Sequence, residues 1–135
     1  MGMKLYCFGE SGHSYKAALA LELAGCDWTP VFVDFFAGET RSDAYRADIN
    51  IMGEVPVLLD GESTLTQSGL IQAYIAEKTG RHGGATDAEK REVLRWILWD
   101  NSKFSTLIGM TRYLMNFIPE AKRPQQVIEF NQARL

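Results

Sequence analysis

Cysteine and histidine are scarce in this chain of 135 residues, with two of each. Cys7 and Cys26 lie far apart in the sequence, and neither belongs to a Cys-x-x-Cys pair. The sequence therefore does not indicate a disulfide framework, and both side chains are predicted to be buried, apolar thiols. His13 has no second histidine near it, so it is predicted to be a solvated loop residue, and no metal site is expected.

Strong charge of one sign and long apolar runs are also missing. The net charge is −3, and the Lys and Arg residues are scattered, so DNA and RNA are not expected as partners. No apolar run approaches the ~18 residues that span a bilayer. The N-terminus has no signal-peptide pattern, and Tyr6 stands where a myristoylation signal needs Ser or Thr. We therefore expect a cytoplasmic protein that does not contact a membrane.

The first 80 residues alternate between short apolar runs with strand composition and helical patterns. Strands are predicted at 4–8, 28–34, 57–59 and 63–66, and helices at 14–25, 43–49 and 67–78. The order is βαβαββα. Its strand, helix, strand opening predicts a parallel pair with a right-handed crossover.

The remaining residues predict a linker and a helical region. Residues 81–85 contain two adjacent glycines and no large apolar residue, which is typical of a linker. Thr86 and Glu89 form a capping box for a helix that reaches Pro119, roughly 48 Å long, with a possible bend at Gly109. A further helix is predicted from 125. The aromatic residues of the long helix are predicted to lie in a core or an interface: Trp96, Trp99, Phe104, Tyr113 and Phe117.

The most informative segment is 53–61, which reads Gly-Glu-Val-Pro-Val-Leu-Leu-Asp-Gly. Because proline has no amide hydrogen for a strand ladder, Pro56 is predicted to lie in a turn that enters a buried strand. If the Val55–Pro56 bond is cis, the main-chain N–H and C=O of Val55 face solvent. An extended peptide can then pair with them as an additional strand.

Gln67 and Ser68 come directly before the last helical pattern of the first 80 residues. The main-chain amides at the start of a helix lack partners, so these amides and the Ser68 hydroxyl can bind an anion. Together with the turn at Val55–Pro56, this segment predicts a site for a small peptide. One end of the peptide is held by its main chain and the other by a carboxylate.

These motifs, in this order, resemble those of the cytosolic glutathione transferases, and in particular of their serine-type, bacterial-like members. The resemblance covers nearly the whole chain. It implies an α/β, thioredoxin-like glutathione-binding domain over residues 1–80 and a linker over 81–85. Residues 86–135 are similar to the first one and a half helices of the family's all-α C-terminal domain, which is incomplete here.

The resemblance assigns roles to individual residues. Ser11 lies in a segment similar to the serine-bearing loop, so it is the implied catalytic residue. Val55 and Pro56 match the family's cis-proline turn, which binds the cysteinyl main chain of glutathione. Gln67 and Ser68 match its pair for the γ-glutamyl carboxylate and amine.

Two more residues of the implied glutathione site stand in segments that depart from the family pattern. Asn50 opens the sequence Asn-Ile-Met-Gly, where the family usually reads Asn-Pro-x-Gly. Glu54 stands directly before Val55, where the family commonly carries a basic or amide residue. The charge of Glu54 is therefore expected to repel the glycine carboxylate of glutathione.

The chemistry required of Ser11 follows from the properties of thiols. A free thiol has a pKa of about 8.5, and only its thiolate attacks an electrophile. Lowering that pKa by about two units requires roughly 2.7 kcal/mol of stabilisation of the anion. A hydroxyl that donates to a charged acceptor contributes about 1.5 to 3 kcal/mol, and a helix N-terminus adds about 0.3 to 1 kcal/mol. Together these two terms are sufficient.

Simpler roles remain open for several of these residues. Ser11 and Ser14 can both serve as helix caps, with Ser14 the stronger candidate. Gln67 and Ser68 can be no more than the start of a helix. Tyr6 competes with Ser11 and Ser14 for thiol activation, because tyrosine-type members of the family use a tyrosine in this strand region.

The family's helical domain normally continues well past residue 135. A long helix that is apolar around much of its circumference must be covered by other elements. We expect either a fragment of a longer protein or a core that a second copy completes. Because the family's dimers pack these helices across a twofold axis, the resemblance implies a homodimer.

Three functions remain open. The first is a glutathione transferase that activates the thiol of glutathione, its substrate or cosubstrate, for attack on a small hydrophobic electrophile. The second is a non-catalytic carrier of glutathione or lipophiles, and the third is a structural protein that retains the transferase scaffold. A glutaredoxin-like thiol exchanger is rejected, because Ser11 stands where that chemistry needs a cysteine and Cys7 lies within a strand.

Overall fold

The computed structural model describes residues 2–135. The chain divides into two compact units, Met1–Val93 and Leu94–Leu135. The first unit contains a four-stranded mixed sheet with helices, and the second is helical.

The sheet of the first unit has the strand order β2-β1-β3-β4. Its strands are β1 (Met3–Cys7), β2 (Trp28–Phe32), β3 (Val57–Asp60) and β4 (Ser63–Thr66). β1 is parallel to β2 and antiparallel to β3, and β3 forms a hairpin with β4. The predicted order βαβαββα and the thioredoxin-like fold are confirmed.

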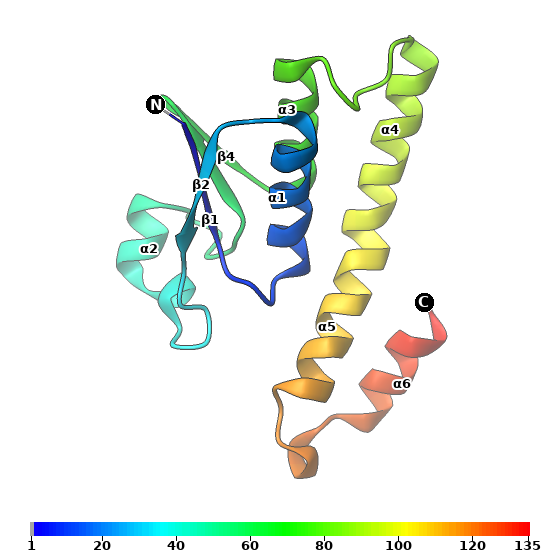
Figure 1. The fold of residues 1–135 in the computed structure, drawn as a ribbon. Helices are drawn as coiled ribbons and strands as arrows, with labels where there is room; N and C mark the ends of the chain where they lie inside the picture. The colour runs from blue at the N-terminus through cyan, green and yellow to red at the C-terminus, as the bar shows by residue number, and fades with distance from the viewer. Residues whose placement is uncertain (1) are drawn as a thin grey trace. The chain divides into compact units, whose positions relative to one another are not determined.

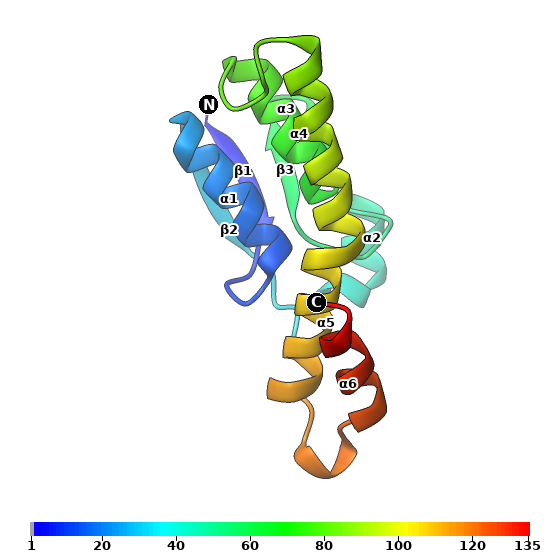
Figure 2. The same ribbon diagram turned by 90° about the vertical axis from the view of Figure 1, so that its right-hand side faces the viewer.

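Two helices cover one face of this sheet, and a short helix lies on the other face (Figure 1). α1 (Gly12–Ala24) and α3 (Ser68–Thr79) run side by side, as Figures 1 and 2 both show, and α2 (Asp43–Asp48) lies on the opposite face. The core between the sheet and the helix pair contains fully buried side chains from β1, α1, β3 and α3: Leu5, Leu21, Leu58, Ile71 and Ile75.

The ends of the helices follow from capping residues. Ser11 caps α1, which begins at Gly12 rather than at the predicted residue 14, and Gly25 ends the helix in the left-handed conformation with φ +70°. Ser42 caps α2 through a hydrogen bond from the Tyr45 amide. Gly80 ends α3 with φ +68°. Glycine reaches this conformation at low cost, so both stops are encoded locally.

The segment predicted to be an unpacked linker is attached to the end of α1. An Arg81 guanidinium nitrogen donates to the Ala24 carbonyl oxygen at 3.1 Å. The His82 ring nitrogen Nε2 lies 3.4 Å from the Leu23 carbonyl oxygen. These carbonyl groups are at the C-terminal end of a helix, where they lack intrahelical partners and favour positive charge.

α4 (Asp87–Trp99) begins with the predicted capping box. The Glu89 carboxylate accepts from the amides of Ala85 and Thr86 at 2.7 and 2.9 Å, and the Glu89 amide donates to the Thr86 hydroxyl at 3.2 Å. These bonds from Thr86 and Ala85 lower the pKa of Glu89. The reciprocal pairing satisfies amides that the first helical turn leaves free.

The helical pattern continues beyond α4 with an irregular turn. A π-helical segment, Asp100–Phe104, joins α4 to α5 (Ser105–Asn116). The irregularity therefore lies before Gly109, where the sequence placed a possible bend. A short turn leads to α6 (Gln125–Ala133), which packs on α5. The buried residues of the second unit are Leu107, Thr111, Ile128 and Asn131.

Aromatic side chains cluster along the second unit. Trp99 packs edge-on against Trp96 at 5.5 Å and stacks on Phe104 at 5.4 Å. All three side chains are between 41 and 51% exposed. They contact one another, but they do not form a closed core.

Candidate functional site

Ser11 lies in the loop that leads from β1 into α1. Its amide donates to the Phe8 carbonyl oxygen at 3.2 Å, and its hydroxyl oxygen accepts the Ser14 amide at 3.1 Å. Ser11 is therefore the N-cap of α1. A hydroxyl that accepts a hydrogen bond still carries its own hydrogen. Within residues 2–135 no acceptor for that hydrogen is found, so Ser11 can cap the helix and donate to a ligand together.

The two alternatives to Ser11 occupy different surroundings. Ser14, favoured as the cap from the sequence, is instead inside α1 and only 3% exposed, and its hydroxyl has no hydrogen-bond partner within the described residues. Tyr6 lies in mid-strand between Leu5 and Cys7, which face α1 and α3. Because side chains alternate along a strand, Tyr6 faces the α2 side. Ser11 alone among the three lies in the loop before the helix.

The Val55–Pro56 peptide bond is cis, as the resemblance to glutathione transferases implied. Pro56 and Val57 are buried, and Val55 is half-buried. Within residues 2–135, no hydrogen bond joins the Val55 main chain to another residue. The N–H and C=O of Val55 are thus free at the point where β3 begins.

Two side chains hold the loop before this turn. Tyr45 Oη and Asn50 Nδ2 each donate to the Glu54 carbonyl oxygen at 2.9 Å, and Asn50 Oδ1 accepts the Met52 amide at 3.1 Å. The two donors use both lone pairs of that carbonyl. Burial raises the pKa of Tyr45 to about 12, with smaller contributions from the Glu39 charge and Tyr6, so Tyr45 keeps its donor hydrogen. Asn50 is 5% exposed and acts inside the loop.

Gly53 is required by the geometry of the same loop. Its φ is +67°, and a Cβ atom added there would lie 2.7 Å from the Thr40 carbonyl oxygen. Real Cβ atoms do not approach a carbonyl so closely, and side chains disfavour this φ. Steric exclusion of a Cβ atom therefore explains why the Asn-Ile-Met-Gly segment ends in glycine.

Gln67 precedes α3 in an unusual main-chain conformation. Its φ is +69° and its ψ is 115°, a region that costs energy for any residue with a Cβ atom. Its side-chain nitrogen Nε2 donates to the Glu54 carboxylate at 3.1 Å and lies 3.3 Å from the Met52 sulfur. The strained residue thus connects the start of α3 to the loop before the cis-proline turn.

His13 connects the start of α3 to the other side of the site. Its ring nitrogen Nδ1 lies 3.1 Å from the Ser68 hydroxyl oxygen. The prediction that His13 is a solvated loop residue is wrong, because it is half-buried in the first turn of α1. The two residues are 55 positions apart, so no local pattern indicated the pair. Two hydrogen bonds therefore join the three predicted segments: His13 to Ser68, and Gln67 to Glu54.

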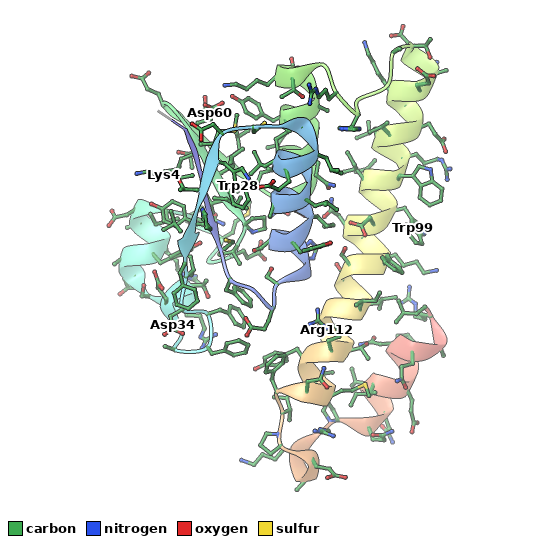
Figure 3. All side chains as sticks on the ribbon, in the orientation of Figure 1. Lys4, Trp28, Asp34, Asp60, Trp99 and Arg112 are labelled. Carbon is green, nitrogen blue, oxygen red and sulfur yellow. The ribbon has the colours of Figure 1, made fainter. Side chains whose placement is uncertain are left out.

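A cluster of phenylalanines stands next to the Ser11 loop. Phe8 stacks on Phe35 with 4.7 Å between ring centroids, and Phe36 packs edge-on against both rings at 5.9 and 5.5 Å. Asp34, labelled in Figure 3, begins the loop that carries Phe35 and Phe36. The Asp34 side chain accepts the Ala37 amide at 3.0 Å, which orders that loop. This cluster was not predicted from the sequence.

The opposite end of the sheet carries a polar network. Asp60, labelled in Figure 3, lies at the end of β3. It accepts hydrogen bonds from the Tyr74 hydroxyl at 2.6 Å and from the Lys78 ammonium. These bonds, first from Lys78 and then from Tyr74, lower the pKa of Asp60. Asp60 belongs to β3, and its two donors belong to α3, so the network attaches this helix to the sheet.

The remaining reactive groups are few. Burial raises the pKa of Cys7 and so disfavours its thiolate. A hydrogen bond with the Val31 main chain opposes this shift without cancelling it. Across residues 2–135, no group of three or more His, Cys, Asp or Glu side chains could hold a metal ion. In the same part of the chain, every helix is too short or too polar to cross a membrane.

The arrangement of sheet, cis-proline turn and helix starts agrees with comparisons to known proteins. Residues 1–77 match the family model described as the glutathione S-transferase, N-terminal domain. The chain belongs to this family. The resemblance to glutathione transferases that the sequence motifs indicated is thereby confirmed.

Relatives with this fold include plant and bacterial proteins. The chain is 36% identical over 114 residues to glutathione S-transferase F14 of Arabidopsis thaliana, a match that covers 78% of this chain and 44% of that protein. It is 32% identical over 108 residues to protein LigF of a Sphingobium species, covering 77% and 42%. The chain thus spans less than half the length of these two relatives.

Solved structures extend the similarity over both units of the chain. The theta class glutathione S-transferase from the citrus canker pathogen Xanthomonas axonopodis pv. citri, solved with glutathione bound, has a TM-score of 0.87 and 28% identity. That match covers 98% of this chain and 65% of the other. Glutathione transferase F2 of Populus trichocarpa, with a TM-score of 0.84 and 24% identity, supports the fold alone, over 98% and 65% of the two chains.

Proposed function

We propose that this chain binds glutathione along the Val55–Pro56 turn and that Ser11 activates the bound thiol. The observation that carries the proposal is the joining of three segments by two hydrogen bonds. His13 pairs with Ser68 and Gln67 pairs with Glu54, each at 3.1 Å. The free main chain of Val55, the start of α3 and the Ser11 loop therefore belong to one connected surface of the first unit.

The central part of glutathione is held by main-chain pairing. Its cysteinyl residue has one N–H and one C=O, which complement the C=O and N–H of Val55. No hydrogen bond to another residue among 2–135 competes for the Val55 main chain. Tyr45 and Asn50 do not need to touch the ligand, because their bonds to the Glu54 carbonyl hold the loop that presents Val55.

The γ-glutamyl end carries a carboxylate and an ammonium group. The Ser68 hydroxyl and the main-chain amides at the start of α3 are suited to the carboxylate. The Gln67 amide nitrogen is occupied by Glu54, so its oxygen remains to accept from the ammonium. The Glu54 carboxylate accepts the hydrogen bond from Gln67 and therefore lies at the γ-glutamyl end of the site. There its charge attracts the ammonium group of glutathione and does not repel the glycine carboxylate.

Ser11 donates its hydroxyl hydrogen to the sulfur of bound glutathione. Donation to an anion contributes about 1.5 to 3 kcal/mol, and the N-terminus of α1, which Ser11 itself caps, adds about 0.3 to 1 kcal/mol. The thiol loses its proton to solvent. The thiolate then forms a bond from sulfur to an electrophilic carbon while the bond from that carbon to its leaving group breaks, and the leaving group departs as an anion.

The electrophile is a small apolar molecule held by the phenylalanine cluster. The Ser11 amide donates a hydrogen bond to the Phe8 carbonyl oxygen, and the Phe8 ring packs with Phe35 and Phe36. Phe36 is 48% exposed, so part of the cluster is available to a ligand. Aromatic rings offer large apolar area with offset or edge-on stacking geometry, which favours an aromatic electrophile.

The protein acts as a homodimer. Apolar side chains of the second unit remain exposed, among them Leu98 at 61% and Phe130 at 60%. A twofold contact between copies would bury such side chains on both copies at once. Sedimentation at micromolar concentration tests this point, and a compact monomer would contradict it.

Calorimetry with glutathione and a steady-state assay with a chlorinated nitroaromatic test the function. Wild-type protein is expected to bind glutathione and to form the conjugate. Ser11→Ala is expected to keep most of the binding and to lose most of the rate. The absence of any binding at millimolar glutathione would overturn the proposal, and equal rates for the two proteins would remove Ser11 from the mechanism.

A further inference from the structure

Met52 has a sulfur that lies beside the proposed glutathione site on a side chain open to solvent. The side chain is 54% exposed. Its sulfur lies 3.3 Å from Gln67 Nε2, the nitrogen that also donates to the Glu54 carboxylate at 3.1 Å. The Met52 amide donates to Asn50 Oδ1 at 3.1 Å, which fixes the main chain that carries the sulfur. An accessible thioether therefore shares one amide nitrogen with the carboxylate of Glu54.

The two hydrogens on the side-chain nitrogen of Gln67 face acceptors of unequal strength. A carboxylate is a strong acceptor, and a thioether sulfur is a weak one. The main chain of Gln67 is held in a strained conformation with φ +69°, which only its surroundings can maintain. A change in acceptor strength at Met52 is therefore taken up by the orientation of the Gln67 side-chain amide.

We propose that Met52 is a site of reversible oxidation by hydrogen peroxide and that its sulfoxide weakens the binding of glutathione. The effect on binding rests on the proposed function. A lone pair of the sulfur attacks one peroxide oxygen, and the S–O bond forms as the O–O bond breaks. The proton of the transferred oxygen passes to the departing hydroxide, which leaves as water. The sulfur loses two electrons, the peroxide gains them, and sulfoxide reductases restore the thioether.

The new oxygen changes the hydrogen bonds of Gln67. A sulfoxide is polar where the thioether was apolar, and the methionine side chain is flexible enough to turn its oxygen toward Gln67 Nε2. The sulfoxide oxygen then competes with Glu54 for the amide nitrogen and reorients the amide. Because the amide oxygen of Gln67 is the proposed acceptor for the ammonium of glutathione, oxidation of Met52 removes a contact with the ligand.

Other methionines of the chain serve as matched controls. Met110 and Met115 are 46 and 39% exposed and belong to the second unit. The Met115 sulfur lies 3.7 Å from Gln132 Nε2, so a thioether stands beside a side-chain amide there as well. Met3 is 7% exposed and lies in the core, so it should resist oxidation. Oxidation of Met110 and Met115 should leave glutathione binding unchanged.

Peroxide treatment of the full chain, followed by removal of the peroxide, provides the test. Peptide mass spectrometry locates the added oxygen, and calorimetry measures the Kd for glutathione. Oxidation should raise the Kd about threefold to tenfold in wild-type protein and in the double variant Met110→Leu, Met115→Leu, on the order of one hydrogen bond. Sulfoxide reductases should reverse the change.

Two substitutions at Met52 separate the sulfur from the shape of its side chain. Met52→Leu keeps a similar size without an oxidisable atom, so its Kd should match the wild-type value before and after peroxide. Met52→Gln places a polar oxygen at a similar reach, so its Kd should be raised without peroxide. If Met52→Leu fails to fold, the double variant before and after oxidation decides.

The side-chain amide signal of Gln67 in an NMR spectrum gives a readout that needs no ligand. It should shift when wild-type protein is oxidised and stay in place in Met52→Leu. An unchanged signal, or oxidation of Met110 and Met115 without oxidation of Met52, would overturn the inference.

The outcomes for binding separate this inference from the proposed function. Normal binding of glutathione with a Kd that does not change when Met52 is oxidised would overturn the inference and leave the proposed function intact. The absence of binding by unoxidised wild-type protein would overturn the proposed function and the effect on binding, while a shifted Gln67 signal would still support Met52 as the oxidation site.

Discussion

The side-chain amide of Gln67 donates to the carboxylate of Glu54 at 3.1 Å. Both side chains are exposed, and Gln67 has a positive φ. The bond turns the Glu54 charge toward the start of α3. This geometry supports a role for Glu54 at the ammonium end of glutathione, although the sequence suggested that its charge would oppose binding.

Replacing Glu54 by glutamine should distinguish the two roles. We expect Glu54→Gln to weaken glutathione binding by about threefold to tenfold, because an acceptor charge near the ammonium is lost while the shape is kept. Calorimetry at low salt measures this change, and a glutathione analogue without the α-amino group should show no difference. Tighter binding of glutathione by Glu54→Gln would mean that the carboxylate repels the ligand.

Substitutions at Ser11 should separate its two hydrogen bonds. Ser11→Thr keeps both the cap and the donor, so activity and stability should change little. Ser11→Asp keeps the cap but has no hydrogen to donate and repels a thiolate, so the conjugation rate should fall by at least tenfold while the protein stays folded. Ser11→Ala should lose the rate and about 1 kcal/mol of stability.

A matched control for the cap exists in α2. Ser42 accepts the Tyr45 amide at 3.1 Å, the same distance as in the pair of Ser11 and Ser14. Ser42→Ala should lower the free energy of unfolding by a similar amount in a denaturant titration. A loss of rate in Ser42→Ala as large as that in Ser11→Ala would attribute the effect to stability alone.

The loop before the cis-proline turn should depend on two donors to one carbonyl. Tyr45→Phe should lower the free energy of unfolding by about 1 kcal/mol and Asn50→Ala by about 2 kcal/mol, because the latter removes two hydrogen bonds of a buried side chain. Urea titration measures both. The double variant should lose less than the sum, since both residues support the same carbonyl. Tyr113→Phe, whose ring stacks on Phe117, serves as the control with little expected effect.

The Asp60 network should make stability depend on acid pH. The pKa of Asp60 is lowered in the folded protein by Lys78 and Tyr74. Its contribution is therefore present above the unfolded pKa of about 3.9 and is lost as the pH falls through the folded value. Asp60→Asn should melt at a lower temperature than wild type at pH 6, and the difference should shrink toward pH 3. Glu62→Gln removes a charge from the neighbouring turn and should not reproduce this pH dependence.

The fold of the first unit could be predicted because its signals are local. Gly25 and Gly80 mark helix ends, the hairpin turn separates β3 from β4, and the proline before β3 restricts the chain to a turn. Each of these features depends on a few neighbouring residues. Their order along the chain was then sufficient to indicate the family.

The site was predicted less completely because several of its contacts are not local. His13 and Ser68 meet only when α1 and α3 pack side by side, and Phe8 meets Phe35 only when β1 pairs with β2. The sequence favoured Ser14 over Ser11 as the cap, and the structure shows Ser11 in that role, because both serines stand before the same helical pattern and the pattern does not fix the first helical residue. The π-helical turn at Asp100–Phe104 had no glycine or proline to indicate it.

The bonds from Arg81 and His82 to the last carbonyl groups of α1 have a practical consequence for anyone who shortens this protein. A fragment that stops at Gly80 would include every strand and helix of the thioredoxin-like fold and would still expose the Ala24 and Leu23 oxygens that these two side chains meet. Expression of the first unit alone should therefore retain residues 81 and 82.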